Sequence, residues 1–242
     1  MFSEYYPFTH YLDVVDKVTK LYEMGGISQQ QFNDFQIYNC STIQKLRSSK
    51  YFYEKLVKFM STPNKYDQSG LDELLCYLNL YLDGFLYNYK SAADVFAHEL
   101  NLLYDIMDPD VNIYMNPNFI KKFKEKKPSA SIITHLDYFD TENNLFKVAN
   151  KYRNYTTHRC IPLSSIELTQ DLNMITIRSG KITYSKCRVT LPDDPFAINP
   201  TYNNNYDILY FCKEVFCELL EAMDKIYELI GTEIDTQKSI PL

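Results

Sequence analysis

The sequence predicts an all-α fold: an up-and-down helical bundle with an extra N-terminal helix and a β-hairpin inserted before the last helix. Five stretches place apolar residues three and four positions apart, the spacing that gives a helix one buried face. One shorter stretch alternates with period two, as a half-buried strand does. Because 45% of the 242 residues are hydrophobic, the chain can build an ordinary core.

The expected helices are delimited by cap and stop residues. In chain order they are residues 9–24, 28–60, 71–107, 142–159 and 206–230. Gly25 and Gly26 end the first helix. Ser28 and Gln31 have the capping-box spacing that begins the second. Thr141 is the expected cap of the fourth.

Three positions predict irregularities or ends within this pattern. Ser48-Ser49 is expected to break the second helix, and Gly84 to kink the third, because serine pairs and glycine weaken a helix locally. Gly231 is the expected stop of the last helix. Residues 1–27 would then be an N-terminal addition to a single domain that spans residues 1–242.

The inserted hairpin is expected within residues 163–200. Two period-two segments, 174–178 and 181–191, flank Ser179-Gly180, a dipeptide suited to a two-residue hairpin turn. A loop rich in Pro, Asn and Tyr follows and leads to the last helix.

The third helix carries a polar row opposite its apolar stripe. The row consists of Asp94, His98, Asn101 and Asp105, and a solvated face is one interpretation. A metal site that uses Asp94 and His98, four residues apart, is the rival. Glu99 interrupts an apolar row instead, so this carboxyl group is expected to need a structural partner or to belong to a site.

Composition and charge exclude some classes of function. The net charge of −6 and the pI near 5.3 argue against a protein that coats nucleic acid through a broad basic surface. The six cysteines form no CxxC pair, so neither disulfides nor zinc are expected. Neither an export signal nor a membrane-spanning segment is visible, which makes the cytoplasm the expected compartment and excludes a membrane partner.

One dense basic run occupies residues 121–127. It reads Lys-Lys-Phe-Lys-Glu-Lys-Lys. Such a run is typical of a soluble helix end, but it also suits a patch that holds RNA phosphates through Lys121, Lys122 and Lys124.

The groups best suited to chemistry lie at the end of the fourth helix. Arg153, Asn154 and His158 fall within six residues, just before Pro162. Arginine grips phosphate oxygens with a planar fork, and histidine exchanges a proton near neutral pH. The 2′-hydroxyl of RNA is an internal nucleophile, so proton transfer and charge stabilisation are sufficient to cleave it. We therefore expect a ribonuclease that needs no metal or other cofactor.

The relative positions of these groups favour two copies of the site. Arg153 and His158 are five residues apart, about 140° around a helix, whereas Asn154 and His158 share a face. A lone histidine cannot easily act as both base and acid in one step. A two-fold dimer that brings two His158 side chains together would solve this.

Residues 153–158 resemble the Arg-x4-6-His motif of the HEPN superfamily, and the order of the four helices from residue 28 onwards resembles its bundle. The resemblance implies a homodimer with metal-independent endoribonuclease activity in toxin–antitoxin or antiviral defence. Arg153, Asn154 and His158 are the motif positions, and RNA and an antitoxin or other regulatory protein are the implied partners. Lys151, Tyr155 and Arg159 are further RNA-binding candidates by their position beside the motif.

Two other functions stay open at this point. A non-catalytic HEPN-like module that dimerises and binds RNA or protein would use the same fold, and the acidic pI favours it. A metal-dependent hydrolase would use Asp94, His98 and Asp105 and would lose activity in a chelator.

Overall fold

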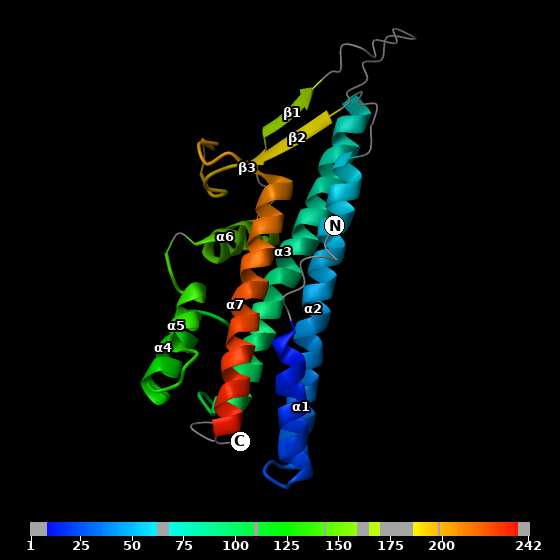
Figure 1. Ribbon diagram of the computed structural model, residues 1–242. Helices are drawn as coiled ribbons and strands as arrows, with labels where there is room; N and C mark the ends of the chain where they lie inside the picture. The colour runs from blue at the N-terminus through cyan, green and yellow to red at the C-terminus, as the bar shows by residue number, and fades with distance from the viewer. Residues whose placement is uncertain are drawn as a thin grey trace. The chain divides into compact units, whose positions relative to one another are not determined.

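Seven α-helices and three short strands make up the computed structural model, which describes residues 9–61, 68–108, 111–142, 144–158, 165–169, 186–197 and 199–236. The all-α prediction is confirmed (Figure 1). The long helices are α1 (His10–Glu23), α2 (Gln29–Ser61), α3 (Gln68–Tyr104), α6 (Leu145–His158) and α7 (Ile208–Thr236). Between α3 and α6 lie α4 (Pro117–Lys126), α5 (Ile133–Leu136) and a 3-10 turn, η1 (Asp137–Phe139).

The start of α2 is the capping box that the sequence predicts. The backbone N–H of Ser28 donates to Oε1 of Gln31 at 2.9 Å, and the backbone N–H of Gln31 donates to Oγ of Ser28 at 3.2 Å. Two orphan donors at the helix start are thereby satisfied.

The expected break in α2 is wrong, and Gly84 does not interrupt α3. Both helices are continuous through Ser48-Ser49 and Gly84. The buried hydroxyl of Ser49 donates to the carbonyl of Phe85 at 3.2 Å, so this serine joins two helices instead of breaking one. A β-carbon on Gly84 would lie 2.6 Å from the Phe52 ring, so glycine is present because α2 approaches closely.

The last helix begins later and ends later than expected. Tyr206–Asp207 form strand β3, and α7 continues through Gly231 to Thr236. A β-carbon on Gly231 would lie 2.6 Å from Oδ2 of Asp13 in α1. The glycine therefore makes room for α1 and does not act as a helix stop.

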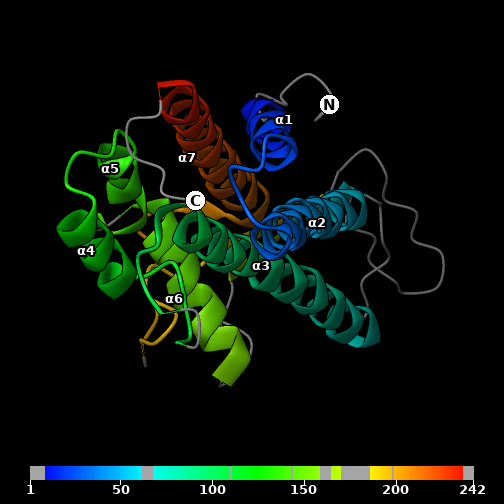
Figure 2. The ribbon, with the colours of Figure 1, turned by 90° about the horizontal axis from the view of Figure 1, so that it is seen from below.

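The chain divides into two compact units, and α2, α3, α6 and α7 contribute to both. The first contains Met1–Leu46, Lys90–Lys147 and Phe216–Leu242; the second contains Arg47–Tyr89 and Val148–Val215. In the first unit, α1 and α5 lie on opposite sides of α7 (Figures 1 and 2). Its most deeply buried side chains include Val14, Val18, Phe35, Phe96, Leu100, Leu103, Phe123, Met223, Ile226 and Ile230.

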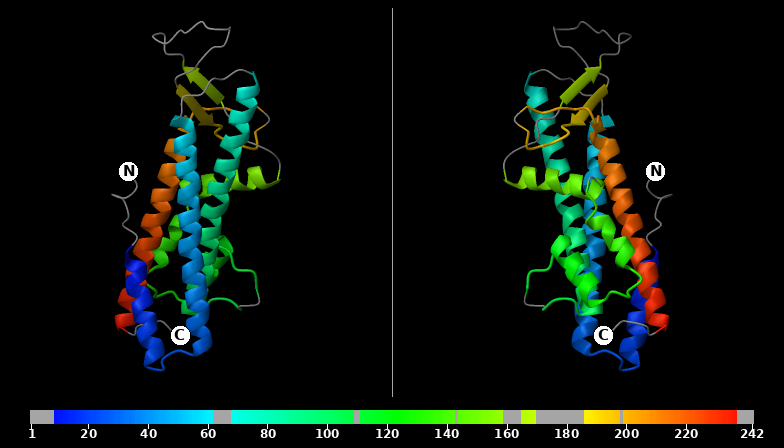
Figure 3. Two further views of the ribbon diagram at one scale, coloured as in Figure 1. Left: turned by 90° about the vertical axis from the view of Figure 1, so that its right-hand side faces the viewer. Right: turned by 90° about the vertical axis from the view of Figure 1, so that its left-hand side faces the viewer.

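The second unit contains the strands. β1 (Ser165–Thr169) pairs antiparallel with β2 (Lys186–Leu191) (Figure 3). β2 also pairs with β3, which gives the order β1-β2-β3. The predicted strand 174–178 and the turn at Ser179-Gly180 lie outside the described residues, and the pairing of 165–169 with β2 was not predicted. Buried side chains of this unit include Leu56, Leu82, Phe85, Leu86, Tyr152, Val189, Leu191, Phe211 and Val215.

None of the helices within the described ranges combines the length and apolar character that crossing a bilayer requires.

Candidate active site

The helix that carries the motif is capped by Asn144, not by the predicted Thr141. Oδ1 of Asn144 accepts the backbone N–H of Lys147 at 2.9 Å, the contact of a helix N-cap. The hydroxyl of Thr141 donates to the carbonyl of Asp137 at 2.7 Å and so belongs to the preceding turn. The helix α6 therefore starts three residues later than expected and ends at His158.

Arg153 and Asn154 contact each other in the last two turns of α6. Nη1 of Arg153 donates to Oδ1 of Asn154 at 3.2 Å, and Nε of Arg153 is buried. Arg153 is half-buried and Asn154 is exposed. The contact steers the guanidinium toward the exposed amide, on the same face as the backbone position of His158 four residues on.

The side chains of His158 and Arg159 fall outside what the structure describes. For His158 the structure gives only the backbone, at the final residue of α6. A protonated imidazole at this end of a helix is favoured by the helix dipole. The roles predicted for these two residues stay predictions.

The two tyrosines beside the motif pack against the segment that follows β2. Tyr152 is fully buried, and its hydroxyl donates a hydrogen bond to the carbonyl of Pro192. Tyr155 is half-buried, with its ring edge-on to Phe196 at a centroid distance of 5.3 Å. These contacts fix α6 relative to the strands of the second unit. Lys151, on the same helix, is exposed.

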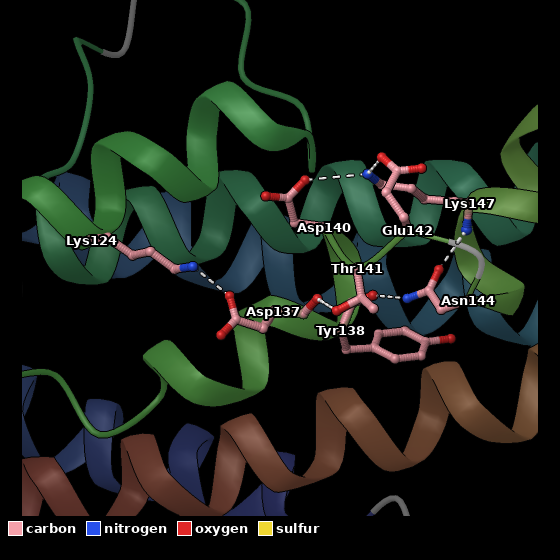
Figure 4. Close-up of polar contacts among 8 residues, drawn as sticks. All are labelled: Lys124, Asp137, Tyr138, Asp140, Thr141, Glu142, Asn144 and Lys147. Atoms are coloured by element: carbon pink, nitrogen blue, oxygen red, sulfur yellow. Dashed lines mark hydrogen bonds and ion pairs between the residues drawn. The ribbon is translucent and has the colours of Figure 1, made fainter.

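The predicted basic run folds as α4 and belongs to the first unit. Lys121 and Lys122 are exposed, whereas the ammonium of Lys124 forms an ion pair with Asp137 (Figure 4). In the same view Lys147 pairs with Glu142 at 2.7 Å and with Asp140 at 3.4 Å. Carboxylates therefore neutralise part of the positive charge in this region.

A surface pocket beside α4 has mixed charge. Its lining comprises Pro117, Ile120, Lys121, Lys124, Glu125 and Asp140. Two cations and two carboxylates in the lining leave no net charge to attract phosphate. RNA binding by Lys121, Lys122 and Lys124 remains a prediction, and the pocket itself adds no support for it.

The polar row predicted for α3 is not a uniformly solvated face: Asp105 is exposed beyond the end of the helix, whereas Asp94 and Asn101 bond other segments. Asn101 is buried, and its amide bonds the backbone N–H and carbonyl of Met107 at 2.7 and 3.0 Å. Asp94 pairs with Lys90 and accepts the backbone N–H of Met115 at 2.9 Å. The row mainly anchors the loop after α3. Among the described residues, no three His, Cys, Asp or Glu side chains gather closely enough to hold a metal ion.

His98 has an aromatic partner instead of a metal. Its ring stacks on Tyr38 at a centroid distance of 5.3 Å and an interplanar angle of 21°. Burial lowers the pKa of His98, against the opposing effect of Asp94. The imidazole is therefore neutral at physiological pH and packs as an aromatic ring.

Glu99 has the structural partners that its position predicted. The side chain is fully buried, and its carboxyl group accepts hydrogen bonds from Tyr227 at 2.9 Å and Asn39 at 3.2 Å. Burial raises the pKa of Glu99 to about 8, so the group is mainly protonated at neutral pH.

One cationic surface was not predicted from the sequence. Arg47, Lys50, Lys55 and Lys58 lie on the second unit's part of α2 and are separated by three to five residues. They form no contiguous basic run. A search at helical spacing from Arg47 would have found them, because positions three, eight and eleven residues further on lie on the same side of a helix.

One comparison with known proteins covers the segment that carries these residues. The sequence model of the Cthe2314-like HEPN family matches residues 38–193, more than half of the chain, and this range includes Arg153 through His158. The chain therefore belongs to the HEPN superfamily. No curated protein and no solved structure matches it.

Proposed function

We propose that this HEPN protein is a metal-independent endoribonuclease that cleaves RNA by attack of the 2′-hydroxyl, in a toxin or antiviral-defence role. The observation that carries the proposal is the hydrogen bond of 3.2 Å from Arg153 to Asn154, five residues before His158, in a segment that the HEPN family model covers. Such chemistry requires at least a guanidinium held in place, here that of Arg153, and a nearby histidine, here His158.

Each group has one role in the proposed reaction. The imidazole of His158 takes the proton of the 2′-hydroxyl as its oxygen attacks phosphorus. The guanidinium of Arg153 stabilises the negative charge on the phosphoryl oxygens. Asn154 positions that guanidinium. As the bond from phosphorus to the 5′-oxygen breaks, the imidazole of a second copy donates the proton that the leaving oxygen needs.

The products are then a 2′,3′-cyclic phosphate and a 5′-hydroxyl, with every proton accounted for. The scheme requires a homodimer, because base and acid act in the same step. We expect the dimer to be the active form, with an antitoxin or other regulatory protein as a further partner.

The test is cleavage of single-stranded RNA in excess chelator. We expect 2′,3′-cyclic phosphate ends, and loss of cleavage in His158→Ala. His135→Ala, a change of a histidine outside the motif, is the matched control and should cut as the wild type does. Unchanged cutting by His158→Ala would show that the proposed base is wrong.

A second variant tests the arginine fork. Arg153→Lys keeps the charge but loses the planar pair of donors, so we expect cleavage to fall roughly 100-fold without loss of folded structure. RNA that stays bound but uncut by the wild type would instead support the non-catalytic RNA-binding module, the alternative that the acidic pI favours.

A further inference from the structure

The outer face of α2 in the second unit combines cations with an exposed aromatic ring. Arg47, Tyr51, Glu54 and Lys58 follow one another at spacings of four, three and four residues, and all four side chains are exposed. These spacings place them on a single helix face. The opposite face of the same turns is buried in the core through Tyr53 and Leu56 among others.

The charge of this face differs in sign from that of the whole protein. Residues 47–61 carry four cations (Arg47, Lys50, Lys55 and Lys58) and one carboxylate (Glu54), so four positive charges minus one negative charge leave +3. The complete chain has a net charge of −6. An acidic protein that attracts a polyanion must do so locally, and this face provides such a place.

The aromatic ring at its centre is available for stacking. Tyr51 is 53% exposed, and the ammonium of Lys55 lies over its ring, 5.0 Å from the centroid. Across the described part of the chain, neither Arg47 nor Lys55 has a carboxylate partner within ion-pair distance. Oε1 of Glu54 lies 3.8 Å from Nζ of Lys50, a long separation for an ion pair.

From this arrangement we infer that the outer face of α2 from Arg47 to Lys58, the α2 face, binds single-stranded RNA. An unpaired base stacks on Tyr51, and the neighbouring phosphates contact Arg47, Lys55 and Lys58. The inference rests on the proposed function in assuming that RNA is the ligand. It adds the place where the strand is held.

The chemistry favours this ligand over other polyanions. An exposed tyrosine can stack on a splayed base, whereas bases paired in a duplex are already stacked on each other. A membrane-binding helix needs a broad exposed apolar face, but here Leu46, Tyr53 and Leu56 are all buried. Tyr51 and its cations therefore suit RNA better than a lipid surface.

Binding can be measured separately from cleavage with a labelled 2′-O-methyl oligoribonucleotide, which lacks the hydroxyl that attacks. By fluorescence anisotropy we expect Tyr51→Ala to weaken binding about tenfold, the usual effect of losing one stacked base. In Arg47→Glu/Lys58→Glu, the plot of log binding constant against log salt concentration should become less steep. We expect the magnitude of its slope to drop by about 0.7 for each phosphate that is no longer neutralised.

The sharpest variant removes the single carboxylate of the face. Glu54→Gln should tighten binding severalfold, a gain that general damage to the fold does not produce. Lys213→Glu reverses an exposed cation of α7 in the same unit and is the control for a charge reversal away from the α2 face, so its affinity should stay within about twofold of the wild type.

The inference is overturned if Tyr51→Ala and Glu54→Gln both bind as the wild type does, or if duplex RNA binds as tightly as single-stranded RNA. It is also overturned if vesicles of phosphatidylserine and phosphatidylcholine bind and respond to the same variants. The proposed catalysis fails separately, if unmodified RNA stays intact while the binding series behaves as described.

Discussion

The phenol of Tyr227 on α7 donates a hydrogen bond of 2.9 Å to the buried carboxyl group of Glu99 on α3. Asn39 of α2 donates to the other carboxyl oxygen at 3.2 Å and lies 3.4 Å from the same phenol. Three helices of the first unit therefore meet at one polar cluster inside an apolar core. Such a cluster is stabilising only while its members stay satisfied.

This cluster makes stability depend on pH. The pKa of Glu99 is raised from 4.5 to about 8 in the folded chain, so the folded state holds a proton that the unfolded state releases between these values. The contribution of Glu99 to the free energy of unfolding is complete below pH 4.5, falls as the pH rises and is lost above pH 8. We expect Glu99→Gln to remove this dependence and to be more stable than the wild type at pH 9 by roughly 1–3 kcal/mol.

Denaturant unfolding at pH 5, 7 and 9 measures this effect. Glu23→Gln, a change of an exposed glutamate at the end of α1, is the control and should follow the wild-type curve. Parallel pH curves for Glu99→Gln and the wild type would contradict the raised pKa.

A second prediction concerns the close approach of α2 and α3 at Gly84. Alanine is the better helix former by about 1 kcal/mol, yet its methyl group would lie 2.6 Å from the Phe52 ring. We expect Gly84→Ala to destabilise the protein by roughly 1–3 kcal/mol through overpacking. In a double-mutant cycle, the same change should be much milder beside Phe52→Ala. If Gly84→Ala were more stable than the wild type, the space between α2 and α3 would be large enough for the added methyl group.

A third prediction concerns the contact that fixes the motif helix. Tyr152→Phe removes the hydroxyl that donates a hydrogen bond to the carbonyl of Pro192. A buried carbonyl that loses its donor costs about 1–3 kcal/mol, so we expect a loss of that size in the free energy of unfolding. Tyr210→Phe, at a position 61% exposed, should change it little. Equal effects of the two changes would argue against the contact.

A fourth prediction concerns the anchor of α1. The carboxylate of Asp224 on α7 accepts the backbone N–H groups of Thr9 at 2.8 Å and His10 at 3.0 Å, and it contacts Nδ1 of His10 at 2.8 Å. It thus acts as a helix cap supplied by a distant segment. In Asp224→Ala, hydrogen exchange in the first turn of α1 should be about fivefold faster, because a lost cap typically costs about 1 kcal/mol.

Asp224→Asn keeps one carbonyl acceptor and should lie between the wild type and alanine. Asp16→Ala, an exposed change within α1, is the control. Slow exchange in Asp224→Ala would show that apolar packing alone holds the helix.

Local patterns were enough to predict most of the helices. The capping box at Ser28 and the buried apolar stripe of α3 from Phe96 to Leu103 are short-range signals, and both are found in the structure. The helix ends at Tyr104, before the predicted residue 107. The motif was also placed correctly near the end of a helix, because the periodicity before it and Pro162 after it delimit that helix.

Features that depend on distant segments were predicted less well. Gly84 and Gly231 look like a kink and a stop in isolation, but each makes room for a neighbouring helix. Asn101 looks solvated, yet it bonds the backbone of a returning loop. The pairing of β1 with β2 depends on a register that separate strand patterns do not define.

The extent of the family match has a practical consequence for domain dissection. A polypeptide trimmed to residues 38–193 would keep Glu99 and Asn39 but lack Tyr227, which lies on α7. The carboxyl group would then be without its nearest donor and without the helix that shields it. A soluble yet inactive fragment of that length would reflect the missing C-terminal helix and would reveal nothing about the chemistry of the motif.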